Sequence, residues 1–101
     1  MFGLGKKKLD ERMLGMISIE LAMFMRWMEE NRQRLLWSDQ AKDIARKILN
    51  RENYKFSEQD LFHIVNLAMV SDATQIDDVR KRTGFDRTIE GFCKSISIPV
   101  P

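Results

Sequence analysis

The sequence has few of the residues that build disulfides, metal sites or catalytic pairs. It contains one cysteine, Cys93, and one histidine, His63, in 101 residues. A single cysteine excludes an intrachain disulfide, and one cysteine with one histidine cannot complete a tetrahedral metal site within the chain. Proline occurs only at Pro99 and Pro101, so no proline interrupts a helix in the body of the chain.

Cys93 and His63 also make a poor catalytic pair. A thiol nucleophile needs a neighbouring base and access to substrate, whereas Cys93 lies on an apolar helical stripe that should pack inward. No strand precedes Gly3 and Gly5, so these glycines do not form a phosphate-binding loop. The sequence therefore predicts a protein that is not an enzyme and that binds no cofactor and no metal.

No apolar run is long enough to cross a membrane. The best candidate, residues 13–28, contains Ser18, Glu20 and Arg26 and is shorter than the roughly 20 residues that a spanning helix needs. Lysines at 6–8 imitate the start of a signal peptide, but Glu20 interrupts the apolar stretch and no small-residue cleavage site follows. We therefore expect a cytoplasmic protein whose lysine-bearing terminus is frayed and solvated rather than bound to a membrane.

The chain instead shows helical periodicity in a globular composition, with 44% hydrophobic and 32% charged residues. Apolar residues recur at three- and four-residue spacings, which predicts an all-α fold. We predict one domain, a small bundle of five helices. Its expected parts are a long N-terminal helix paired with a second helix within residues 1–52, a three-helix unit over residues 56–96, and an extended tail at residues 97–101.

Apolar stripes and capping residues set the expected boundaries of the first two helices. The first should run from about Lys8 to Arg34. The second should begin at an N-cap residue, Ser38 or Asp39, and reach about Asn50.

The remaining helices have clearer start and stop signals. Ser57 is the expected N-cap of the third helix, with an acid three residues later as in a capping box. Residues 61–70 are apolar almost all round, which predicts that this helix is buried between neighbours. The fourth helix should cover residues 74–83 and end at Gly84 in a left-handed C-cap, and the fifth should follow Asp86.

Charge is distributed unevenly along the chain. Residues 56–79 contain five acids and no lysine or arginine, whereas residues 80–101 contain five bases against two acids. The small formal net charge of +2 therefore does not reveal that one stretch of the chain is acidic and its C-terminal end is basic. Such an asymmetry can orient a partner or a second copy of the chain.

The first helix carries a broad apolar arc that is rich in methionine. The arc is wider than one neighbouring helix would cover, which indicates a central helix or a subunit contact. Because thioether side chains repack against varied shapes, we predict that the arc binds another protein or forms a homo-oligomer, with core filling as the alternative. The residues assigned to this partner-binding surface are Met13, Met16, Glu20, Met23, Phe24 and Trp27.

Glu20 lies near the centre of that arc. A carboxylate among apolar side chains must be paired, protonated or hydrated. Glu20 either meets a basic residue from another part of the chain, such as Arg34 or Lys55, or sets the register of a self-associating helix pair.

The last helices have the order and lengths of a helix-turn-helix motif, with Gly84 at the turn. As an alternative function, residues 74–96 would bind nucleic acid. The residues assigned to that interface are Arg80, Lys81, Arg82, Arg87, Thr88 and Lys94.

Three features count against the nucleic-acid alternative. Arg80 stands four residues before Gly84, where the motif usually has a small residue, and burying its charge would be costly. Asp77 and Asp78 would face phosphates. The sequence after Ile96 is too short to build a wing. Whether Arg80 is buried or exposed therefore decides whether these helices pack as in a helix-turn-helix motif.

Overall fold

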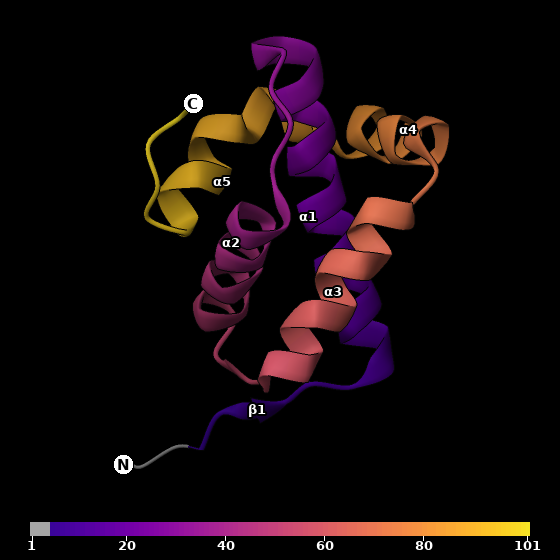
Figure 1. The fold of residues 1–101 in the computed structure, drawn as a ribbon. Helices are drawn as coiled ribbons and strands as arrows, with labels where there is room; N and C mark the ends of the chain where they lie inside the picture. The colour runs from indigo at the N-terminus through magenta and orange to yellow at the C-terminus, as the bar shows by residue number, and fades with distance from the viewer. Residues whose placement is uncertain (1–4) are drawn as a thin grey trace.

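The computed structural model describes residues 5–101 and contains five α-helices, a short 3-10 helix and a pair of two-residue strands (Figure 1). The all-α prediction is confirmed. In chain order the elements are β1 (Lys7–Lys8), α1 (Glu11–Arg32), α2 (Ser38–Arg51), β2 (Tyr54–Lys55), α3 (Glu58–Val70), α4 (Ala73–Thr83), η1 (Phe85–Thr88) and α5 (Ile89–Ser95).

Helix α1 occupies the centre of the bundle. It packs against α2, α3 and α4, and α2 also packs against α3. In Figure 1, α4 and α5 lie on opposite sides of α1. With 22 residues, α1 is about 33 Å long, which is enough to contact several shorter helices along its length.

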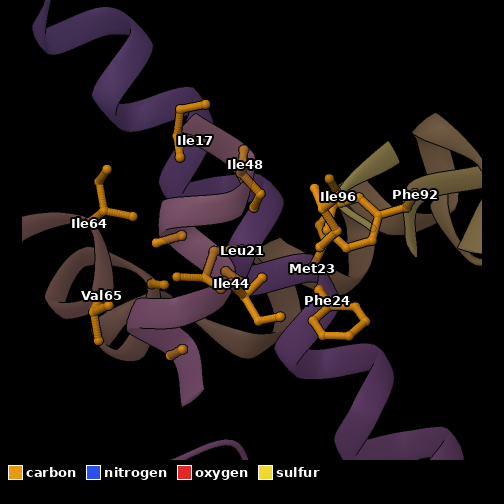
Figure 2. Close-up of a cluster of buried hydrophobic side chains, with 14 of the residues drawn as sticks. Ile17, Leu21, Met23, Phe24, Ile44, Ile48, Ile64, Val65, Phe92 and Ile96 are labelled. Carbon is orange, nitrogen blue, oxygen red and sulfur yellow. The ribbon is translucent and has the colours of Figure 1, made fainter. Parts of the chain in front are cut away.

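Buried side chains from the five helices form one apolar cluster, part of which is drawn in Figure 2. Leu21 of α1 lies among Ile44 of α2 and Ile64 of α3 in this cluster. Farther along α1, the ring of Phe24 lies 5.2 Å from the ring of Phe92 in α5. The C-terminal helix is thus attached to the core through aromatic contact with α1.

The three C-terminal helices, expected as a unit over residues 56–96, each have a different set of neighbours. Helix α3 packs on α1 and α2, whereas α4 packs on α1 and joins α5 through η1. The long central helix therefore separates elements that a helix-turn-helix core would bring together.

The N-terminus differs from the sequence prediction in a way that has a local cause. Asp10 caps α1 by accepting a hydrogen bond of 2.8 Å from the backbone N–H of Met13, so the helix begins at Glu11 and not at Lys8. Lys7 and Lys8 instead form β1, which pairs in parallel with β2. The prediction of a frayed terminus is wrong for these two lysines; residues 1–4 lie outside the described part of the chain.

Most other cap predictions agree with the structure. Ser57 and Asp60 exchange the two hydrogen bonds of a capping box at the start of α3. Gly84 ends α4 with φ of +67°. The N-cap of α2 is Trp37, one residue earlier than predicted, and its N–H donates to the side chain of Gln40 at 3.0 Å.

Helix α3 is buried on one side only, which corrects the prediction that it is covered all round. Leu61 and Ile64 are fully buried, whereas Phe62, Met69 and Val70 are exposed. The reason is that α1 and α2 are its main neighbours, and they cover a single helical stripe that includes Leu61, Ile64 and Ala68. Three large apolar side chains of α3 are therefore left open to solvent beside His63 and Asn66.

The C-terminal tail turns back toward the bundle. Ser97 has φ of +60°, and the N–H of Ile98 donates to the carbonyl of Cys93 at 3.0 Å. Ile98, Pro99 and Pro101 then line one hollow together with residues of α1 and α2. Within residues 5–101, every helix is too short or too polar to span a membrane.

Replacing Gly84 by alanine tests the left-handed cap. The added Cβ would stand 2.9 Å from the guanidinium of Arg87, and an L-residue at this φ costs about 1–2 kcal/mol. We expect Gly84→Ala to lower the free energy of unfolding in urea by about that amount. Gly91→Ala is the control, because a Cβ there meets nothing within 4 Å and should be stabilising by about 0.5–1 kcal/mol. Equal effects from both variants would contradict the cap assignment.

Candidate functional site

A groove of about 380 Å³ follows the N-terminal half of α1, and we call it the methionine groove. Helix α1 supplies most of its lining, the end of α2 adds Arg51 and Glu52, and α4 adds Val79 and Thr83. The α1 residues that line it are Met13, Met16, Ile17, Ile19, Glu20 and Met23. The helix spacing of these residues explains why one groove gathers them.

The predicted partner-binding residues divide into an accessible group and a buried group. Met16 is 50% exposed, and Met13 and Glu20 are half-buried, so these three line the groove and reach solvent. Phe24 and Trp27 are buried in the core, where their rings stack with centroids 6.3 Å apart. Only the N-terminal part of the predicted surface is therefore available to a partner.

Met23 and Ile19 complete the description of the groove. Met23 lines it but is buried, because α4 covers this part of α1 and Thr83 Oγ1 lies 3.9 Å from Met23 Sδ. Ile19 is 40% exposed and was missed by sequence reasoning. Its position three residues after Met16, on the same side of the helix, is the signal that could have identified it.

Glu20 is paired within the chain. Its two carboxylate oxygens accept hydrogen bonds of 2.7 and 3.2 Å from the guanidinium of Arg51 at the end of α2. The prediction of a basic partner from another helix is confirmed, but the partner is Arg51 and not Arg34 or Lys55. Burial lowers the pKa of Arg51, and the carboxylates of Glu20 and Glu52 outweigh burial, so that its pKa is raised.

A second set of charges, the ionic cluster, joins α1, α4 and η1 at the other end of the bundle. At its centre is Arg80, only 4% exposed. Its guanidinium donates to Asp77 at 2.7 Å and to Asp86 at 2.6 and 3.0 Å, and it lies 2.8 Å from Glu30. The buried charge is thus matched by three carboxylates, which offsets the cost of desolvation.

Arg26 of α1 extends the ionic cluster. It donates two hydrogen bonds to Asp77, at 3.1 and 2.8 Å, and also contacts Glu29 and Glu30 of its own helix. Asp77 therefore bridges Arg26 and Arg80. The hydrogen bonds from Arg26 are the main reason that the pKa of Asp77 is lowered below its ordinary value of 3.8.

The predicted nucleic-acid residues also divide into two groups. Lys81, Arg82, Arg87, Thr88 and Lys94 are exposed. Arg80 is buried and fully engaged by carboxylates, so it is not available to a phosphate. A helix-turn-helix motif usually has a small residue at this position. Here the residue is an arginine, and its ion pairs allow it to be buried.

Two further features of residues 74–96 differ from a helix-turn-helix motif. Helix α5 has seven residues and follows a 3-10 turn. Lys81 and Arg87 line the same hollow as the acids Glu30, Asp77 and Asp86. A phosphate at this place would meet carboxylates as well as cations.

A second apolar groove, of about 400 Å³, was not predicted. It lies where the loop between α1 and α2 meets the end of α3, and its lining includes Leu35, Trp37 and Met69. Trp37 is 72% exposed and Met69 is 43% exposed. Three consecutive apolar residues at 35–37, directly after the polar end of α1, are the sequence signal for it.

The single histidine and the single cysteine differ in their exposure to solvent. His63 is exposed on α3, whereas Cys93 is fully buried, and its burial raises the pKa of the thiol. Among residues 5–101, no three His, Cys, Asp or Glu side chains are placed to hold a metal ion. Cys93 is therefore a poor nucleophile at neutral pH.

Because of the ionic cluster, the stability of the fold should depend on pH through the charge of Asp77. Because its folded-state pKa is lowered, the stabilisation from its charge is complete above the ordinary pKa of 3.8 and is lost as pH falls through the folded-state value. We expect Asp77→Asn to be less stable than the wild type at pH 7, with the difference shrinking below pH 3.8. Urea unfolding at a series of pH values measures this.

Asp78→Asn is the matched control for that experiment. Asp78 is the neighbouring exposed carboxylate and takes part in none of the ion pairs of residues 5–101. A pH dependence that is the same for both variants would show that the ionic cluster does not contribute through Asp77.

The chain matches no protein-family model, no curated protein and no solved structure. Its function must therefore be inferred from its own geometry.

Proposed function

We propose that this chain is a small non-enzymatic interaction or regulatory protein that binds another protein, or a second copy of itself, through the methionine groove. The observation that carries the proposal is the exposure of Met16 and Ile19 on the central helix, at the edge of a groove. Large apolar side chains that the fold leaves uncovered beside a groove are typical of interaction sites.

The physical chemistry of the groove suits a protein partner. Met16 and Ile19 are about half exposed, so covering the rest of each side chain on binding contributes about 1 kcal/mol. Thioethers adapt to the shape of what they meet, so Met13 and Met16 can pack against an apolar stripe of a partner helix. Glu20, Arg51 and Glu52 supply the charges that would orient that helix.

The same proposal includes a cytoplasmic setting. A chain whose single thiol is buried needs no oxidising compartment to fold. This part of the proposal is independent of which protein occupies the groove.

Nucleic-acid binding is the alternative function, and it has less support. Five of the six assigned residues are exposed, which favours it. Against it, Arg80 is held by three carboxylates and the first helix of the motif carries Asp77 and Asp78. Phosphate contacts would require those acids to lie away from the duplex.

Two glutamate substitutions test the methionine groove. We expect Met16→Glu to abolish retention of a binding partner on the immobilised protein, because a carboxylate would have to be desolvated in the interface. Met69→Glu is the matched control, since Met69 is similarly exposed but lies in the other apolar groove. Mass spectrometry compares the proteins retained by each variant, including untagged copies of this chain.

The outcome of that comparison is decisive for the site. Loss with Met16→Glu and retention with Met69→Glu supports the methionine groove. The reverse pattern would move the binding site to the groove at Trp37 and Met69. Identical retention by both variants and the wild type would contradict binding through either groove.

Fluorescence anisotropy with a labelled mixed-sequence duplex tests the alternative. We expect no binding at physiological salt, because the exposed bases share their end of the bundle with the acids of the ionic cluster. Binding that weakens steeply with salt and is lost in an Arg87→Ala, Lys94→Ala double variant would instead support nucleic-acid recognition.

A further inference from the structure

We propose that the methionine groove receives a second copy of this chain, with the two α1 helices antiparallel about a twofold axis at Met16. This inference rests on the proposed function and names the partner for the same groove. It is carried by a self-complementary pattern of side chains along the uncovered part of α1.

The pattern follows from twofold symmetry. In an antiparallel helix pair centred on residue 16, each residue faces the one that is equally far from the centre on the second copy. Met16 then faces Met16, and Met13 faces Ile19, so apolar side chains meet apolar side chains. Arg12 faces Glu20, so opposite charges meet twice, once at each end.

These residues are on the right side of α1 and are accessible. Arg12, Met16 and Ile19 follow one another at spacings of four and three, which places them on one face of the helix. All three are exposed, and Met13 and Glu20 lie half-buried beside them. Beyond this stretch Met23 is covered by α4, so the uncovered seam ends there.

Charge within the groove favours an arginine from a second copy. Glu20 and Glu52 both pair with the single guanidinium of Arg51, at 2.7 and 2.9 Å. Two carboxylates therefore share one cation. Arg12 enters into none of the ion pairs found in residues 5–101. Arg12 of the second copy would supply the second cation at Glu20.

The expected association is reversible. The seam from Arg12 to Glu20 is only about 12 Å long, so it buries less surface than the roughly 1,200–2,000 Å² of interfaces that hold stable complexes. Each copy also has its own buried core. The mass in solution should therefore rise with concentration from 11.9 kDa toward twice that value.

Cysteine cross-linking tests the axis directly. A disulfide forms only when the two Cα atoms approach within about 7 Å, so Met16→Cys should give a covalent dimer under mild oxidation. The native thiol does not interfere, because Cys93 is fully buried. Met69→Cys is the control, with 43% exposure against 50% for Met16. We expect at least about tenfold more covalent dimer from Met16→Cys, since only that position lies on the axis.

A mixture of two variants tests the register. When Met13→Cys and Ile19→Cys chains are mixed, disulfides should join one chain of each kind, because residue 13 faces residue 19. Either variant alone should give little dimer. A parallel pair would give the opposite result, with each variant linking to itself.

A charge reversal tests the polar ends of the seam. Arg12→Glu in the Met16→Cys chain replaces both opposite-charge pairs by like charges, so the dimer yield should fall about tenfold. Arg34→Glu in the same chain is the control, because Arg34 is exposed just after the C-terminal end of α1, at the opposite end of that helix from Arg12. A circular-dichroism melt confirms that each variant is folded.

Equal cross-linking of Met16→Cys and Met69→Cys, or a mass of 11.9 kDa at all concentrations, would overturn the self-association. The proposed function has its own outcome. If the dimer fails but Met16→Glu still loses a retained protein, the groove binds a different protein and the proposed function stands. If both experiments fail, the methionine groove is not a binding site.

Discussion

Burial of the apolar arc of α1 is the interaction on which the other helices depend. Helices α2, α3 and α4 each pack on this one helix, and α5 joins it through the contact between Phe24 and Phe92. Within residues 5–101, α3, α4 and α5 make no comparable direct contact with one another. Helices α4 and α5 are instead linked by η1, which contacts both. A helix that is apolar over a wide arc can act as a common core for neighbours that pack little on one another. The same property explains why a polar substitution at Leu21, at the centre of Figure 2, would affect the whole fold rather than one helix.

The polar side of α1 contributes in a different way. Its C-terminal end carries Arg26, Glu29 and Glu30, which meet Asp77 and Arg80 of α4. An arginine that is almost fully buried is tolerated because three carboxylates surround it, and these carboxylates come from three different elements. The ionic cluster thereby holds α4 against the C-terminal half of α1. It also removes one cation from the basic C-terminal segment, so the charge seen in the sequence overstates what that segment offers to a partner.

The methionine groove exists because α1 is longer than the surface that its neighbours cover. Helix α4 ends at Thr83 and α2 ends at Arg51, and both ends lie at the rim of the groove. Past them, the N-terminal half of α1 exposes Met16 and Ile19. Glu20 and Arg51 mark the boundary between core and groove, since each is partly buried and paired with the other. A boundary of this kind lets the same helix stabilise the core at one end and leave apolar side chains exposed to solvent at the other.

The sequence by itself determined the helical fold, the capping box at Ser57 and the left-handed end of α4 at Gly84. Each of these depends on residues close together in the chain, where spacing and backbone preference decide the outcome. Only the tertiary structure decided which apolar residues are covered. Phe24 and Trp27 are buried although they belong to the same arc as Met16, whereas Phe62 and Met69 are exposed although α3 is apolar almost all round. Periodicity identifies the residues that share a face, but the helix that covers the face comes from elsewhere in the chain. The choice of Arg51 as the partner of Glu20 and the burial of Arg80 among carboxylates have the same origin.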